Sequence, residues 1–248
     1  MRIRLVVLFS FAVLAASAGP ASAETWHARD GHGDVRSYHL DLTQECEAIT
    51  GGERVAQDRR HDITRISVDH GSDALVAKIR LRDLPRRGPG MNYDYDVEVR
   101  TPDHMFDVSL VVESASGRVE TSLLRVRRSR DPDAPRCGPR LEAHDRDCAG
   151  LAAEVDRRSN SVSVTVPRVC LGGPRWVRVG AVAAGLGGGG FGDGSDVVVL
   201  LDAWGPSQFP ITRLLPPLGP RVHVASCRRP TGWGVAAGLR HTPERARA

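Results

Sequence analysis

The clearest structural signal in the chain is the alternation of side chains in Leu75-Val76-Ala77-Lys78-Ile79-Arg80-Leu81-Arg82. The odd-numbered positions are all apolar, and the even-numbered positions are basic from residue 78 onward. A β-strand turns successive side chains to opposite faces, so a period of two predicts a strand with one buried face. The same period recurs in Tyr93–Arg100 and in Ser161–Val166. These three segments therefore predict half-buried strands of antiparallel sheets.

Less regular apolar segments of similar length predict the remaining strands. They are Val35–Leu42, Ile63–Val68, Phe106–Val112, Val119–Val126, Leu151–Val155, Trp176–Ala181 and Val197–Leu201. Gly, Asn, Asp and Ser clusters lie between many of them, and no segment shows the period of a long amphipathic helix. The expected fold class is all-β, an antiparallel β-sandwich that is immunoglobulin-like or jelly-roll-like, with an irregular Gly/Pro-rich C-terminal part.

Three stretches interrupt this pattern. Residues 127–140 are rich in Arg, Asp and Pro, and they are a candidate linker within a sandwich region expected over residues 24–227. Residues 185–195 hold many glycines and predict a flexible loop, and residues 206–220 are rich in proline. Residues 228–248 are expected to form a disordered tail. Whether the region is one domain or two is left open.

The N-terminus has the three-part layout of a secretory signal peptide. Arg2 and Arg4 precede an apolar run from Leu5 to Ala16, and an A-x-A cleavage signal ends at Ala23. The apolar run is shorter than the ~20 residues that a membrane span needs. We expect cleavage after Ala23 and a secreted protein with no membrane span.

The charge balance argues against one class of function, and the cysteine content indicates the compartment in which the protein is found. The 34 basic residues fall to 32 when Arg2 and Arg4 are removed, against 30 acidic residues, and this near balance argues against a nucleic-acid binder. The five cysteines follow the leader, and in an exported protein they predict disulfides.

One disulfide pairing follows from the strand pattern. Cys148 precedes the strand candidate at Leu151–Val155, and Cys170 follows the candidate at Val162–Val166. A hairpin of these strands would bring its outer ends together, within the reach of a Cys148–Cys170 bridge. The pairing of the other three cysteines is left open; they are Cys46, Cys137 and Cys227.

Two parts of the chain resemble secreted proteins of actinobacteria that have no assigned function. They are Asp62–His70 with the following Leu75–Leu84, and Val164–Val179. The likeness extends over residues 30–182, and the Gly/Pro-rich C-terminal part departs from it. The resemblance implies β-sandwich strands with a cysteine just before a Trp-containing strand, and it brings no catalytic residues.

No catalytic, cofactor or metal site is expected. Ser195 lacks a G-x-S-x-G setting, and the chain holds no H-E-x-x-H, P-loop or dinucleotide motif. The carboxylates at residues 30–34 and 193–196 could contribute to a calcium site, but neither stretch adds a suitable Glu, so ordinary Asp/Gly turns are favoured. His61 and His70 are expected to be isolated surface residues.

The carboxylates Asp94, Asp96 and Glu98 share one face of a predicted strand. Paired carboxylates can hydrolyse glycosides, but neighbours two residues apart point the same way rather than across a cleft. We expect instead that this strand pairs with residues 75–82. Its carboxylates would then lie opposite Lys78, Arg80 and Arg82 as a charge ladder.

The expected function is therefore a secreted, non-enzymatic β-sandwich protein that binds a ligand or has a structural role in the envelope or the medium. The alternatives are an extracellular carbohydrate-binding module and a polysaccharide-acting hydrolase. Candidate partners are cell-wall polysaccharide and another secreted protein. Trp204, Phe209 and Trp233 are the candidate ligand contacts, because exposed aromatic rings can stack on sugars.

Overall fold

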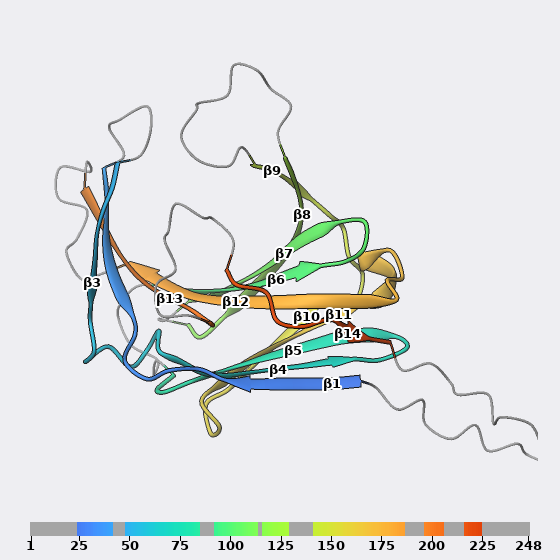
Figure 1. Ribbon diagram of the computed structural model, residues 1–248, viewed down its shortest axis with the longest axis horizontal. Helices are drawn as coiled ribbons and strands as arrows, with labels where there is room; N and C mark the ends of the chain where they lie inside the picture. The colour runs from blue at the N-terminus through green and yellow to red at the C-terminus, as the bar shows by residue number, and fades with distance from the viewer. Residues whose placement is uncertain are drawn as a thin grey trace, which may run out of the picture.

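The computed structural model shows a two-layer antiparallel β-sandwich, which confirms the expected all-β class (Figure 1). It describes residues 24–41, 48–84, 92–113, 116–128, 141–186, 196–205 and 216–224. The expected tail, most of the expected Gly-rich loop and most of the candidate linker lie outside these residues, and β12 (Trp176–Leu186) includes the first two residues of that loop. Among the described residues we find no helix with the length and apolar character needed to cross a bilayer.

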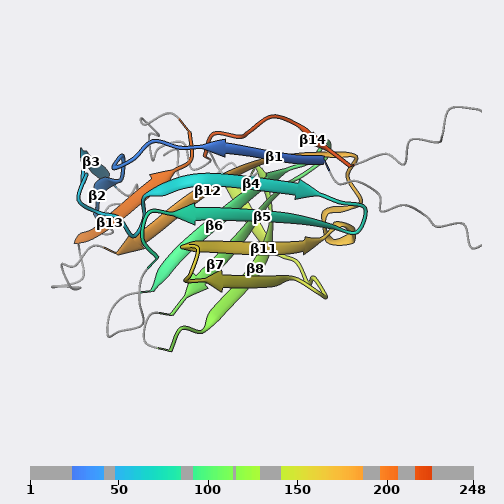
Figure 2. The ribbon, with the colours of Figure 1, turned by 90° about the horizontal axis from the view of Figure 1, so that it is seen from below.

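The smaller sheet has five strands. Their order is β1 (Glu24–Arg29), β4 (Ile63–His70), β5 (Ala74–Leu81), β11 (Ser161–Pro167) and β10 (Ala152–Asp156). All of its strand pairs are antiparallel. Figure 2 shows this sheet in front, with strands of the second sheet crossing obliquely behind it.

The larger sheet has nine strands. Its order is β3 (Ala48–Arg54), β2 (Arg36–Asp41), β13 (Asp196–Ala203), β12 (Trp176–Leu186), β6 (Tyr93–Arg100), β7 (Met105–Val112), β8 (Val119–Arg128) and β9 (Leu141–Asp145). The short strand β14 (Val222–His223) pairs with the N-terminal part of β12, and β13 pairs with its C-terminal part. At one end of the molecule, β2 and β3 stand upright beside the layers (Figure 1).

The core lies between the two sheets and is built from the faces that the alternation predicts. In β5 the buried apolar residues are Leu75, Ala77, Ile79 and Leu81, and in β6 they are Tyr95, Val97 and Val99. Each is at most 1% exposed, so the apolar face of either strand is removed from water almost completely. Strands from both sides of residues 129–140 contribute to both sheets.

The predicted pairing of β5 with β6 is wrong. The two strands lie in different sheets: β5 pairs with β4 and β11, and β6 pairs with β12 and β7. Their apolar faces both contribute to the shared core, but from different sheets rather than side by side in one sheet. Lys78 therefore lies opposite Ser67 and Ser163, and the basic residues of β5 do not form a ladder with the carboxylates of β6.

The two ends of the described chain meet at one edge of the sandwich. The backbone N–H of His223 in β14 donates a hydrogen bond to Oε2 of Glu24, the first residue of β1. Nearby, the carbonyl of Val222 lies 3.0 Å from Nδ1 of the buried His70 at the end of β4. Through β14, the larger sheet therefore contacts the edge of the smaller one.

Candidate functional site

Four aspartates gather where loops from both sheets meet. We call them the aspartate cluster: Asp30, Asp34, Asp62 and Asp202. Asp30 directly follows β1, Asp34 precedes β2, Asp62 precedes β4, and Asp202 lies near the end of β13. A carboxylate oxygen from each of Asp34, Asp62 and Asp202 lies within 4.8 Å of the others. The ends of strands in both sheets therefore present acidic groups to one point.

The turn that carries Asp30 and Asp34 depends on two glycines. A Cβ added to Gly31 would come within 2.8 Å of Oδ2 of Asp34, so a larger residue would displace that carboxylate. Gly33 has a φ of 67°, a backbone conformation that glycine adopts without strain. Arg54 on β3 holds the same turn, because its guanidinium donates hydrogen bonds to the carbonyls of His32 and Gly33.

Asp62 and Asp202 are the most deeply buried members of the aspartate cluster, at 0% and 3% exposed. Oδ2 of Asp202 accepts a hydrogen bond of 2.7 Å from the backbone N–H of Ile63. Oδ2 of Asp62 accepts a 2.8 Å bond from the N–H of Gly33 and lies 3.3 Å from Nη1 of Arg82. The acidic groups are thus fixed by backbone amides and one guanidinium.

Three buried oxygens of the aspartate cluster have no hydrogen-bond partner among the described residues. They are Oδ2 of Asp30, Oδ1 of Asp34 and Oδ1 of Asp62. Buried polar atoms in proteins are almost always paired with protein, water or an ion. These three oxygens are therefore free to bind a proton donor, a water molecule or a hard cation.

The electrostatics of the aspartate cluster oppose full ionisation. Burial raises the pKa of Asp202 to about 8, and the nearby carboxylates of Asp34, Asp30 and Asp62 add to the effect, although the amide of Ile63 opposes it. Burial likewise raises the pKa of Asp30 to about 7. Negative charge gathered here needs compensation by protons or by a cation.

A second acidic group lies on the face of β6 that points away from the core. We call it the carboxylate row: Asp96 and Glu98 on β6 with Asp107 on β7. Glu98 is directly opposite Asp107, and on its other side it faces Gly180 of β12. In the described sheet no basic residue is directly opposite these carboxylates, which further contradicts the expected ladder.

Burial raises the pKa values of the whole carboxylate row. The pKa of Asp96 rises to about 6, and that of Asp107 to about 7, where the charge of Asp96 adds to burial. The pKa of Glu98, which is 4% exposed, also rises to about 7 because of burial and the neighbouring Asp107, while Arg100 opposes the shift. These carboxyl groups can therefore hold protons near neutral pH.

The two histidines expected at the surface are buried, which corrects that prediction. His61 is 3% exposed; its Nδ1 lies 3.2 Å from Oδ1 of Asp58, and its ring packs against Tyr93 with the centroids 5.6 Å apart. His70 is fully buried beneath β14. Neither histidine stands alone, because each ring nitrogen Nδ1 contacts an oxygen.

The candidate ligand contacts are only partly within the described chain. Trp204 is half-buried and packs edge-on against Trp26 of β1, with the ring centroids 5.1 Å apart, so it belongs to the border of the core. Phe209 and Trp233 lie outside the described residues. A different aromatic residue, Trp176, has the guanidinium of Arg221 stacked 4.5 Å from its ring centroid.

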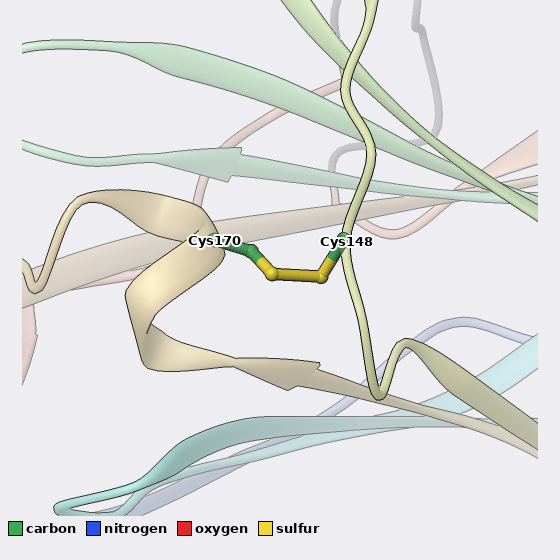
Figure 3. The surroundings of a disulfide bond; sticks show 2 residues. All are labelled: Cys148 and Cys170. Atoms are coloured by element: carbon green, nitrogen blue, oxygen red, sulfur yellow. A yellow bond between two sulfur atoms is a disulfide. The ribbon is translucent and has the colours of Figure 1, made fainter.

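The predicted disulfide is confirmed. Cys148 precedes β10, and Cys170 lies in the 3₁₀ helix η1 (Arg168–Leu171) that follows β11 (Figure 3). Their Cα atoms are 5.6 Å apart, and β10 and β11 pair as the expected antiparallel hairpin. Cys46, Cys137 and Cys227 lie outside the described residues.

Sequence reasoning does not predict the aspartate cluster as a site. The Asp30–Asp34 turn was considered as a source of cation ligands, but Asp62 and Asp202 were not associated with it. Asp62 directly precedes the predicted strand Ile63–Val68, and Asp202 directly follows the predicted strand Val197–Leu201, so a lone carboxylate at a strand end is the local signal at each position. Comparison of the chain with protein-family models, curated proteins and solved structures found no match.

Proposed function

We propose that this chain is an exported, non-enzymatic β-sandwich protein that acts by binding or as a structural component of the cell envelope or the medium. The observation that carries the proposal is the Cys148–Cys170 disulfide, which closes a surface hairpin. Such bonds persist in oxidising compartments and are rare in reducing cytosols. The three-part leader supports the same conclusion.

Export is tested by expressing the full chain in a bacterial host with a native-like secretion system. We expect the protein in the medium, with Glu24 at its N-terminus and with Cys148 linked to Cys170 in the peptide map. Ala23→Phe is the matched control, because signal peptidase requires a small residue there, and this variant should keep its leader. Recovery of the wild type in the cytoplasm with Met1 intact would contradict the proposal.

The ligand is sought by incubating the mature protein with purified cell wall, soluble polysaccharides and the proteins of the medium. Saturable retention on one of these materials, abolished by prior heat unfolding, is the expected result. If substitution of Phe209 or Trp233 by alanine abolishes retention on polysaccharide while the far-UV circular dichroism is unchanged, the binding is of the carbohydrate-module type. Failure to bind any of the materials would leave only the structural role.

A second candidate function, hydrolysis of a polysaccharide, is favoured by the carboxylate row. A carboxyl group that stays protonated near neutral pH can act as a general acid, and a neighbouring ionised carboxylate can act as base or nucleophile. Release of reducing ends from wall polysaccharide by the wild type, and its loss in both Glu98→Gln and Asp107→Asn, would establish this function. Absence of release by folded wild-type protein would exclude it for the polysaccharides used.

A further inference from the structure

We propose that the aspartate cluster is a binding site for a divalent cation, and that the cation is Ca²⁺. This inference goes beyond the binding or structural role proposed above and does not depend on it. It rests on the placement of four carboxylates from separate segments and on the oxygens among them that lack a partner.

The first support is the convergence of the ligands. Carboxylate oxygens of Asp34, Asp62 and Asp202 lie within 4.8 Å of one another, and Asp30 acts electrostatically on Asp202 from the same turn as Asp34. These residues are far apart in the sequence, so the fold itself brings them together. Oxygens at such separations can contact one central ion, since Ca²⁺–oxygen distances are about 2.3–2.6 Å.

The second and independent support is the unpartnered carboxylate oxygen of Asp62. Its Oδ2 is used by the Gly33 amide and by Arg82, whereas Oδ1 has no partner in the described chain although the residue is 0% exposed. A buried carboxylate oxygen without a partner is costly, so an ion is a physical reason for its presence. Asp34 and Asp30 add one such oxygen each.

The charges around the aspartate cluster leave room for a cation. Arg82 forms an ion pair with Asp62, and among the described residues it is the guanidinium that pairs with the aspartate cluster. Arg54, the other nearby guanidinium, is engaged with backbone carbonyls of the turn. Four carboxylates against one guanidinium leave a negative site that a doubly charged ion can balance.

The ligand chemistry selects among cations. The donors are carboxylate oxygens, which hard cations prefer, whereas a typical zinc site would include His or Cys ligands. His61 is next to Asp62, but its Nδ1 faces Asp58. Ca²⁺ accepts irregular geometry and six to eight oxygens, some from water, whereas Mg²⁺ demands a compact octahedron. Ligands on two loops and a strand end fit the more tolerant ion.

A cation at this position would connect the two sheets. Asp30 and Asp62 adjoin β1 and β4 of the smaller sheet, and Asp34 and Asp202 adjoin or belong to β2 and β13 of the larger sheet. The disulfide bridges the region around β10 and η1, whereas the aspartate cluster lies at other strand ends. Ca²⁺ would thus stabilise the fold at a second, separate place.

The test uses the mature, oxidised protein after treatment with a chelator, with CaCl₂, MgCl₂ and ZnCl₂ as the probes. Isothermal titration calorimetry up to ~10 mM covers the range of extracellular calcium modules. We expect one Ca²⁺ bound per chain, weaker binding of Mg²⁺ and Zn²⁺, and a Tm that rises with Ca²⁺ concentration. Absence of both heat and Tm change with Ca²⁺ in folded protein would overturn the proposal.

Asp62→Asn and Asp202→Asn locate the site. Each keeps an acceptor oxygen for its backbone partner but removes a charge, and we expect at least ~10-fold weaker Ca²⁺ binding. The matched control, Asp145→Asn on exposed β9, should bind as the wild type does. Unchanged affinity in both cluster variants, or equal loss in the control, would refute the assignment. If one variant fails to fold, the other variant and the wild-type titration still show whether the aspartate cluster binds Ca²⁺.

Discussion

Replacement of Glu98 by glutamine is expected to make the protein more stable at high pH. Glu98 is 4% exposed on β6, directly opposite Asp107, and its pKa is raised to about 7 from a normal value of 4.5. Glutamine has nearly the same shape and never ionises. The substitution therefore removes the electrostatic cost of a buried charge while the strand pairing is kept.

The size and sign of the effect follow from the two pKa values. Below pH 4.5 the carboxyl is protonated in both folded and unfolded chains, so this residue makes its full contribution to stability. That contribution is lost as the pH rises from 4.5 to about 7, because the unfolded chain ionises before the folded chain does. The loss amounts to about 3 kcal/mol above pH 7. Relative to the wild type, Glu98→Gln should gain about this much between pH 4 and pH 8.

Urea unfolding followed by tryptophan fluorescence at several pH values between 4 and 8 measures this difference. The glutamine amide can add an offset, but that offset does not change with pH, so the slope is the informative quantity. Glu154→Gln on the exposed face of β10 is the matched control and should show a much smaller change in slope. Parallel pH profiles for the wild type and Glu98→Gln would refute the reasoning.

Two further predictions concern local packing. Replacing both Cys148 and Cys170 by alanine should lower the free energy of unfolding by about 3 kcal/mol, because the disulfide closes a loop with a sequence separation of 22 residues. Urea unfolding measures this difference. Reduction of the disulfide in the wild type should lower the free energy of unfolding by the same amount. Gly219→Ala should lower the free energy of unfolding by ~1–3 kcal/mol, because the added Cβ would lie 2.5 Å from the Trp26 ring. Gly71→Ala is the control: its added Cβ would have its nearest contact at 3.4 Å, so this variant should change the free energy of unfolding little in the same assay.

The strands could be predicted from the sequence because their alternation is local. The apolar positions Leu75, Ala77, Ile79 and Leu81 of β5 and Tyr95, Val97 and Val99 of β6 are buried in the structure, whereas the buried Glu98 departs from the pattern. β1 was missed although Trp26 and Ala28 alternate with polar residues, because this short pattern directly follows the leader. β3 was missed because Gly51 and Gly52 interrupt it.

Strand pairing could not be predicted in the same way, because it depends on contacts that are distant in sequence. The strands β5 and β6 are consecutive and have matching apolar faces, which suits a hairpin as well as two strands stacked across a core. The actual neighbour of β6 on one side is β12, some 80 residues later. The aspartate cluster was hidden for the same reason, since Asp202 and Asp62 are far apart in the sequence and lie close together only in the folded chain.

The bond between Glu24 and His223 has a consequence for the order in which the chain can fold. β1 completes its contacts only when β14, the last described strand, is available, and β12 must also wait for β13 and β14, which follow it in the chain. Contacts between such distant residues form slowly compared with local hairpins. A chain that becomes available N-terminus first therefore cannot complete both sheets until residue 223 is available for pairing. If the chain is exported as proposed above, this delay would let it cross a membrane pore as an extended thread, with folding and disulfide formation on the far side.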